Sequence, residues 1–233
     1  MLILALDSTA VVATAAICED ETVLAAKTVS CGLKHSETLL PMTEELLERA
    51  GKSVSDIDLF ACSVGPGSFT GVRIGAATVK GLAFGGKNCV GVSTLEALAY
   101  NLRGEKGIIS PVMDARRSQT YNALFRWENG ELIRLTPDRV IMVDALAKEL
   151  TAYDEPIFFC GDGYTMAKEA VLLATVQETP EEKIAQNAVS VAALALREYK
   201  AGRFVKDDAL RPTYLRAPQA ERERNERLGI VIE

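Results

Sequence analysis

Residues 57–84 read IDLFACSVGPGSFTGVRIGAATVKGLAF, and this stretch decides most of what the sequence says about the fold. The apolar run 57–64 predicts a buried strand, and the residues from Thr70 to Phe84 predict a long helix. Between them, GPGSFTGVRIG (65–75) places glycines where the strand meets the helix N-terminus. Such a junction either cradles a phosphate on free backbone N–H groups or packs closely, with Gly71 and Gly75 admitting another helix. We favour close packing, because no Lys–Ser/Thr pair follows the glycines as in a Walker loop.

The rest of the chain repeats a pattern of strands followed by helices. An apolar strand ending in an aspartate opens each half, at Asp7 and again at Asp114. The polar, glycine-containing stretch 103–107 predicts a linker between the halves. Strands are predicted at 2–6, 11–18, 22–29, 57–64, 90–92, 108–113, 120–127, 131–135 and 157–160, and helices at 36–50, 70–84, 94–102, 143–150 and 188–199. This order predicts a duplicated α/β unit, with an N-terminal domain at 1–104 and a C-terminal domain at 105–233.

Composition excludes several classes of protein. The 233 residues carry a net charge of -6, which argues against a self-sufficient nucleic-acid binder. No apolar stretch is long enough to span a membrane, and the N-terminus lacks the basic region of an export signal. Five scattered cysteines form no C-x-x-C pair, so we expect a cytoplasmic protein without a disulfide framework. The single histidine, His35, excludes H-E-x-x-H zinc chemistry.

Few side chains are candidates for catalysis. Asp7 and Asp114 would face each other across a cleft and hold Mg²⁺ in an ATP-dependent phosphotransferase or hydrolase. The alternative, which we favour, is that both carboxylates cap strand ends or hydrogen-bond a neighbouring turn, because no glycine follows Asp7 to admit a phosphate. Ser68 does not match the G-x-S-x-G elbow of serine hydrolases, and His35 has no partner nucleophile that the sequence identifies. Mixed runs of arginine and glutamate in the tail are typical of a solvated helix face, and a local RNA contact is the less favoured alternative; the arginines are Arg211, Arg216, Arg222, Arg224 and Arg227.

With these motifs in place, the sequence resembles the bacterial TsaB (YeaZ) family over nearly the whole chain up to Arg216. The matching segments are ILALDST, HSETLLP, GPGSFTGVRIGAATVKGLAF, VSTLEALA, DARRSQTY and PTYLR. One departure is DST at residues 7–9, where the family usually reads Asp-Thr-Ser. The tail beyond Pro218 carries no signal of the family.

The resemblance implies a fold of two ribonuclease-H-like halves, of the actin/Hsp70/sugar-kinase type. It also implies a non-catalytic subunit in the formation of tRNA N6-threonylcarbamoyladenosine (t6A). In that system the paralogue TsaD carries the metal and transfers the threonylcarbamoyl group, and the ATPase TsaE joins the pair. Thr94 and Leu98 stand where TsaD-type sequences have two metal-binding histidines. A hydroxyl and an isobutyl group cannot replace two imidazole ligands, so we expect no catalytic residue, metal or cofactor here.

The resemblance further implies that two helices form the contact with TsaD, and with a second copy of the chain when it is alone. These are the helix beginning near His35 and the helix after GPGSFTG. tRNA would then be reached through the complex, with no membrane involved. The predicted interface consists of His35, Ser36, Leu39, Leu40, Thr43, Leu47, Phe69, Gly71, Val72, Arg73, Gly75, Ala76 and Val79.

Overall fold

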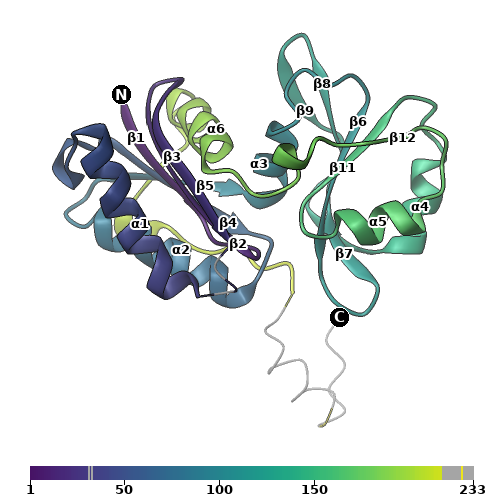
Figure 1. Cartoon of the computed structure of the whole chain (residues 1–233), viewed down its shortest axis with the longest axis horizontal. Coiled ribbons are helices and arrows are strands. Elements are labelled where there is room, and N and C mark those ends of the chain that lie inside the picture. The colour runs from purple at the N-terminus through teal and green to yellow at the C-terminus, as the bar shows by residue number, and fades with distance from the viewer. Residues whose placement is uncertain (31, 33, 217–226, 228–233) are drawn as a thin grey trace.

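Strand β1 (Leu2–Asp7) forms the centre of the first sheet, and all six of its residues are buried. It pairs antiparallel with β2, where Leu4 lies opposite Ile17, and parallel with β4, where Leu4 lies opposite Phe60. The computed structural model describes residues 1–30, 32, 34–216 and 227 (Figure 1). In the first sheet the strand order is β13 (Val205–Lys206), β5 (Asn88–Ser93), β4 (Leu59–Gly65), β1, β2 (Val12–Glu19) and β3 (Thr22–Ser30).

Helices cover both faces of this sheet. Leu4 and Leu6 of β1 point into a cluster with α1 (His35–Ala50) and α2 (Phe69–Leu82). Ile3 and Ala5 point the opposite way, into a cluster with α6 (Ala188–Lys200). This alternation follows from the two-residue period of a strand, and it explains why β1 is apolar throughout. Figure 1 shows α1 and α2 on one side of the sheet and α6 on the other.

The second sheet is built around β6 (Ile108–Asp114) in the same way. Its strand order is β10 (Arg139–Met142), β7 (Gln119–Asn122), β6, β11 (Ile157–Cys160) and β12 (Val176–Gln177). The hairpin of β8 (Phe125–Glu128) and β9 (Glu131–Arg134) pairs with β6 as well. Helices α4 (Val143–Leu150) and α5 (Tyr164–Ala170) cover one face, and α3 (Thr94–Tyr100) packs on the other.

Both sheets share one topology. In each, the first strand lies between an antiparallel partner that follows it in sequence and a parallel strand that comes later. When these strands are numbered in chain order within each half, their order across the sheet is 3-2-1-4-5. The strands are β3-β2-β1-β4-β5 in the first half and β10-β7-β6-β11-β12 in the second. The predicted fold class, α/β with two ribonuclease-H-like halves of mixed sheets flanked by helices, is therefore confirmed.

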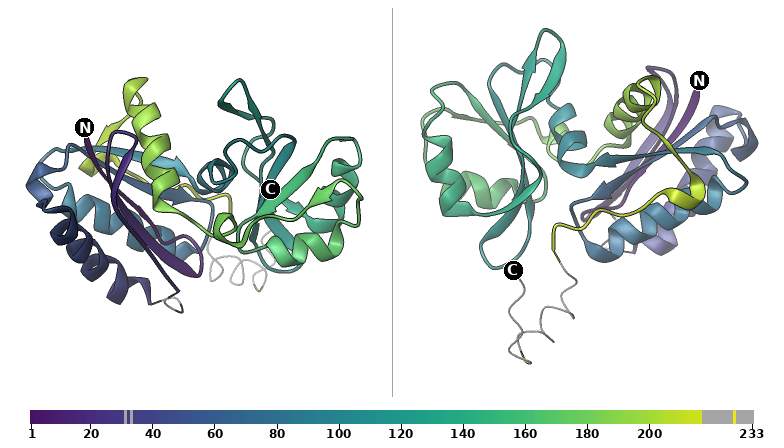
Figure 2. Two further views of the ribbon diagram at one scale, coloured as in Figure 1. Left: turned by 45° about the horizontal axis from the view of Figure 1, so that its top comes forward. Right: turned by 180° about the vertical axis from the view of Figure 1, so that it is seen from behind.

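The predicted domain boundary differs from the structure at its C-terminal side. The sequence predicts that residues 105–233 form the second half, but α6 packs on β1 and β2 of the first sheet, and β13 pairs with β5. The reason is the apolar face of α6, where Val191, Ala192 and Ala195 are buried in the cluster that contains Ile3. Figure 2 shows the segment after α6 returning along the first half beside α2.

Several elements also depart from the sequence prediction. The single strand predicted at 120–127 is two strands, β7 and β8, which pair with different neighbours. The prediction missed β10, α5, β12 and β13, and the short helical turns Val54–Asp56, Glu181–Lys183 and Asp207–Ala209. Strands as short as two residues carry no periodicity to detect.

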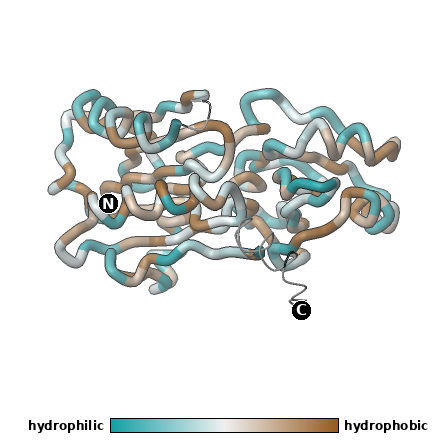
Figure 3. Tube along the Cα trace, turned by 90° about the horizontal axis from the view of Figure 1, so that it is seen from below, coloured by the Kyte–Doolittle hydropathy of each residue, from teal (hydrophilic) through white to brown (hydrophobic). Residues whose placement is uncertain are grey.

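Hydrophilic and hydrophobic residues alternate along the helical coils in Figure 3, as expected for helices that cover a sheet. Among the described residues, no helix combines the length and the apolar character that crossing a bilayer requires. The four cysteines in this part of the chain, Cys18, Cys62, Cys89 and Cys160, are free and buried, whereas Cys31 lies outside the described residues.

Candidate functional site: the carboxyl edge of the first sheet and the face of α1 and α2

Asp7 ends β1 and organises the turn that follows it. Its Oδ1 accepts hydrogen bonds from the backbone N of Thr9 at 2.8 Å and from the Thr9 hydroxyl at 2.7 Å. The side chain is only 1% exposed. Burial raises the pKa of the Asp7 carboxyl, against the lowering effects of Ser63, Thr9 and His35. The Ser63 hydroxyl lies on the neighbouring strand β4 but not in hydrogen-bonding geometry, and Asp7 Oδ2 has no hydrogen-bond partner in the described part of the chain. This carboxyl holds a turn together and is closed to solvent.

The glycines of the 65–75 loop are packed against the chain's own backbone. A Cβ atom on Gly71 would lie 2.0 Å from the carbonyl oxygen of Ser8, and one on Gly67 would lie 2.5 Å from that of Thr9. On the other side, a Cβ on Gly65 would lie 2.4 Å from the carbonyl oxygen of Thr213. These distances are far shorter than any tolerated contact, so the loop is filled from both sides.

Backbone hydrogen bonds fasten the same loop. The N–H of Ser68 donates to Thr9 O at 2.7 Å, and the N–H of Thr213 donates to Val64 O at 2.7 Å. The Ser68 side chain caps α2 by accepting from the N–H of Gly71. The structure therefore supports close packing and not a phosphate cradle. The segment that packs against the glycines is the turn at residues 8–9. The sequence predicts that another helix would pack there.

The equivalent edge of the second sheet is formed around Asp114, which is exposed. Asp114 forms an ion pair with Arg116 at 3.3 Å, and its backbone N–H donates to Asp162 Oδ1 at 3.1 Å. Desolvation by the surrounding chain, together with the nearby Asp114 carboxylate, raises the pKa of Asp162 to about 6. Within the described residues, no three His, Cys, Asp or Glu side chains gather closely enough to hold a metal ion. The arrangement required by the phosphotransferase alternative, two open carboxylates around Mg²⁺, is absent from that part of the chain because Asp7 is buried.

Helix α3 fills the space between the halves with apolar side chains. Thr94 and Leu98 are fully buried. Leu98 lies in a cluster with Ile109, Met113 and Cys160 of the second half, and a Cβ on Gly161 would lie 3.2 Å from its Cδ1. The position of Leu98 is therefore occupied by apolar packing, which leaves no place for an ion.

Many residues of the predicted partner interface lie inside this chain. His35 is buried and its Nε2 donates to Ala10 O at 2.8 Å. The apolar stripe on α1 faces the first sheet, as does the stripe on α2. This corrects the prediction for the following residues, which are buried: His35, Leu39, Thr43, Leu47, Gly71, Val72, Gly75, Ala76 and Val79.

The remaining predicted residues lie on the outer side of the two helices. Ser36 and Arg73 are exposed, Leu40 is 43% exposed, and Phe69 is half-buried. Helix α1 also exposes Pro41, Glu44 and Glu48, and α2 exposes Thr70 and Ala77. Because α1 and α2 pack side by side, these residues form one continuous surface, which we call the α1–α2 face.

Tyr214, which no sequence pattern predicts, also belongs to this face. Its ring lies 4.8 Å from that of Phe69, and the Arg73 guanidinium lies 3.8 Å above the Phe69 ring. Arg73 Nε also donates to the Tyr214 hydroxyl at 2.8 Å. Tyr214 lies 141 residues from Arg73 in sequence, so no local pattern could have joined them. Just beyond it, Arg216 donates to Ala115 O at 2.8 Å and so ties the C-terminal segment to the second half. Arg222 and Arg224 of the predicted tail lie outside the described residues.

Comparison with known proteins agrees with this geometry. A family model described as "TsaD: tRNA N6-adenosine threonylcarbamoyltransferase" matches residues 30–223. The tRNA threonylcarbamoyladenosine biosynthesis protein TsaB of Bacillus subtilis is 34% identical over 172 residues, which cover 73% of this chain and 75% of that protein. The protein of the same name in Escherichia coli is 39% identical over 134 residues, covering 56% and 58% of the two chains.

Among solved structures, YeaZ from Pseudomonas aeruginosa superposes with a TM-score of 0.77 at 27% identity, covering 92% of this chain and 99% of that one. The likeness thus extends over both halves and agrees with the sequence identities. The chain belongs to the TsaB (YeaZ) family of tRNA threonylcarbamoyladenosine biosynthesis proteins.

Proposed function

We propose that this protein is the non-catalytic subunit of the cytoplasmic t6A machinery, which binds TsaD through the α1–α2 face and, together with TsaE, activates it. The observation that carries the proposal is the contrast between two regions. The loop that would bind a phosphate is filled by Ser8, Thr9 and Thr213, while the outer side of α1 and α2 exposes anchoring side chains.

The composition of the α1–α2 face suits a protein partner. Arginine and tyrosine are enriched among the residues that dominate binding energy, and Arg73 and Tyr214 meet at its edge. Both side chains stack on Phe69 and are hydrogen-bonded to each other, which fixes them before a partner arrives and reduces the entropy lost on binding. Leu40 and Pro41 add an apolar surface on α1. A stable contact of ordinary size buries about 800 Å² on each partner, which two adjacent helices of 16 and 14 residues can supply.

Light scattering of this chain mixed with TsaD tests the proposal. We expect a heterodimer at micromolar concentrations, and Leu40→Glu or Arg73→Glu should weaken it by at least about tenfold. Leu172→Glu is the matched control, because Leu172 is 87% exposed and lies in the second half. Absence of a complex would refute the proposed function. If both face variants still bind TsaD but Leu172→Glu does not, the proposed function stands and the choice of the α1–α2 face is refuted.

A further inference from the structure

Helix α3 joins the two halves through apolar contacts. Leu95, Leu98 and Leu102 pack against Ile109 and Phe125 of the second half, and all five are fully buried. Apolar burial is strong but has little directional preference. The cluster therefore holds the halves together, and directional contacts at its edge are the ones that constrain an angle most sharply.

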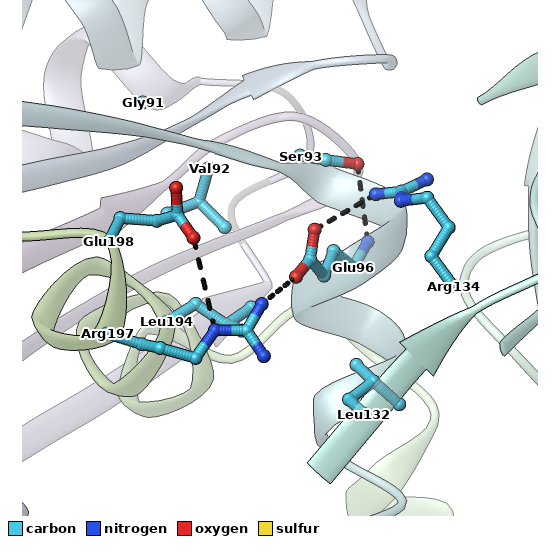
Figure 4. Close-up of a pocket in the computed structure, with 9 residues that line it drawn as sticks. All are labelled: Gly91, Val92, Ser93, Glu96, Leu132, Arg134, Leu194, Arg197 and Glu198. Carbon is cyan, nitrogen blue, oxygen red and sulfur yellow. Dashed lines mark hydrogen bonds and ion pairs between the residues drawn. The ribbon is translucent and has the colours of Figure 1, made fainter. Parts of the chain in front are cut away.

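Charged side chains from both halves meet at the rim of this cluster. They line a cavity of about 310 Å³ between β5, α3, β9 and α6 (Figure 4). Arg134 comes from β9 of the second half, whereas Arg197 comes from α6, which covers the first sheet. Figure 4 shows both guanidinium groups directed at Glu96 of α3. Each arginine in the cavity wall already forms an ion pair with a carboxylate. These charges therefore neutralise one another and are not available to a ligand.

Glu96 is the centre of this network. Its Oε2 accepts from Arg134 Nη2 at 3.0 Å, and its Oε1 accepts from Arg197 Nη2 at 2.6 Å. A carboxylate that accepts from two guanidinium groups, one on each side, has a single orientation that satisfies both. Its side chain is 21% exposed, so the surrounding protein reduces screening by solvent.

A second contact crosses between the halves beside Glu96. The Ser93 hydroxyl at the N-terminus of α3 donates to Asp138 Oδ2 at 2.6 Å and accepts from the N–H of Glu96. Asp138 also accepts from Arg134, so the two crossing contacts are joined. Hydrogen bonds to charged groups are short and directional, which is the property that the apolar cluster lacks.

We propose that Ser93, Glu96, Arg134, Asp138 and Arg197 form an interlobe clamp that fixes the angle between the two halves. The clamp makes the two sheets one rigid body, although apolar packing alone would let them rock about α3. This inference does not depend on the proposed function.

Pulsed electron paramagnetic resonance on the full chain tests the clamp. Spin labels at Glu48→Cys on α1 and Leu172→Cys in the second half report the distance between the halves, in a Cys31→Ser background. We expect one narrow distance distribution in the parent protein. Glu96→Gln and Arg134→Gln should each widen it at least about twofold or shift it, because domain motion is the default once an interface stops constraining it.

The matched control is Glu149→Gln. Glu149 pairs with Arg139 at 2.8 Å, but both residues lie within the second half, so the distribution should stay unchanged. Circular dichroism checks that each variant is folded. If Glu96→Gln is not folded, Arg134→Gln provides the test of the clamp. Parent-like distributions in the clamp variants would overturn the proposal. Equal widening in the control would also overturn it, because loss of any ion pair would then suffice.

Discussion

Three glycines of α2 offer a graded test of what the glycine-rich helix is for. A Cβ on Gly71 would lie 2.0 Å from the backbone oxygen of Ser8, and one on Gly75 would lie 2.8 Å from the Ser8 hydroxyl. A Cβ on Gly81, in the same helix, would meet nothing within 4 Å. Alanine substitutions at the three positions therefore differ in one quantity, which is how severely the new Cβ atom clashes with the turn at residues 8–9.

The expected magnitudes follow from two opposing effects. Alanine in place of a helical glycine stabilises a helix by about 1 kcal/mol. Overpacking costs about 1–3 kcal/mol and more when backbone has to move, as it does at Gly71. We expect Gly71→Ala to lower the free energy of unfolding by about 2 kcal/mol or more. Gly75→Ala should lie between the other two, since the Ser8 hydroxyl that its Cβ would meet is buried and donates to Gly71 O at 2.9 Å, and Gly81→Ala should raise stability by about 0.5–1 kcal/mol.

Urea denaturation followed by circular dichroism measures all three values. An intramolecular role for the glycines is supported if Gly81→Ala is the most stable variant, Gly75→Ala is intermediate and Gly71→Ala is the least stable. If Gly71→Ala is as stable as Gly81→Ala but fails to bind TsaD, the glycines serve the partner and our reasoning is wrong.

Three further predictions concern buried groups and the glycine loop. Burial raises the pKa of the Asp7 carboxyl, so the folded state binds its proton more tightly and stability falls as pH rises above about 4. Asp7→Asn, which keeps an acceptor for Thr9, should therefore be more stable than the parent in urea at pH 7, with the difference closing toward pH 4; a less stable variant at pH 7 would contradict this. Burial also raises the pKa of Cys18 and Cys89 to about 11, and that of Cys62 and Cys160 further. In a Cys31→Ser background these thiols should react with a disulfide reagent only after denaturation, and fast reaction of the folded protein would count against their burial. Finally, calorimetry of the isolated chain with Mg-ATP should give a Kd weaker than about 1 mM, because the glycine loop is filled; micromolar binding that Asp7→Asn abolishes would revive the phosphotransferase alternative.

The central elements of the fold could be predicted because their patterns are local. The run 2–6 is apolar throughout since β1 is covered on both faces, and α1 repeats its apolar residues every three or four positions until Gly51 ends it in a left-handed conformation. The repeat of a strand ending in aspartate likewise indicated the duplicated unit. Short strands such as β12 and β13 have no such pattern, because their partners and not their sequence decide that they are strands.

The candidate site was predicted less well, and the reason is physical. Periodicity identifies the apolar stripe of a helix but not what covers it. Leu39, Thr43 and Leu47 were assigned to a partner, although a helix beside a sheet first covers the sheet of its own chain. The same holds for Gly71, whose small size serves the turn after β1. Tyr214 could not be found at all, since its contact with Arg73 depends on where the C-terminal segment returns.

The most direct test of the account is t6A formation on unmodified tRNA by TsaD and TsaE, measured by mass spectrometry of nucleosides with and without this chain. We expect modification only when this chain is present, a reduced yield with Arg73→Glu when this chain is limiting, and none from this chain by itself. Equal modification in its absence, or turnover by the isolated chain, would contradict the claim that it activates a partner without catalysing the reaction.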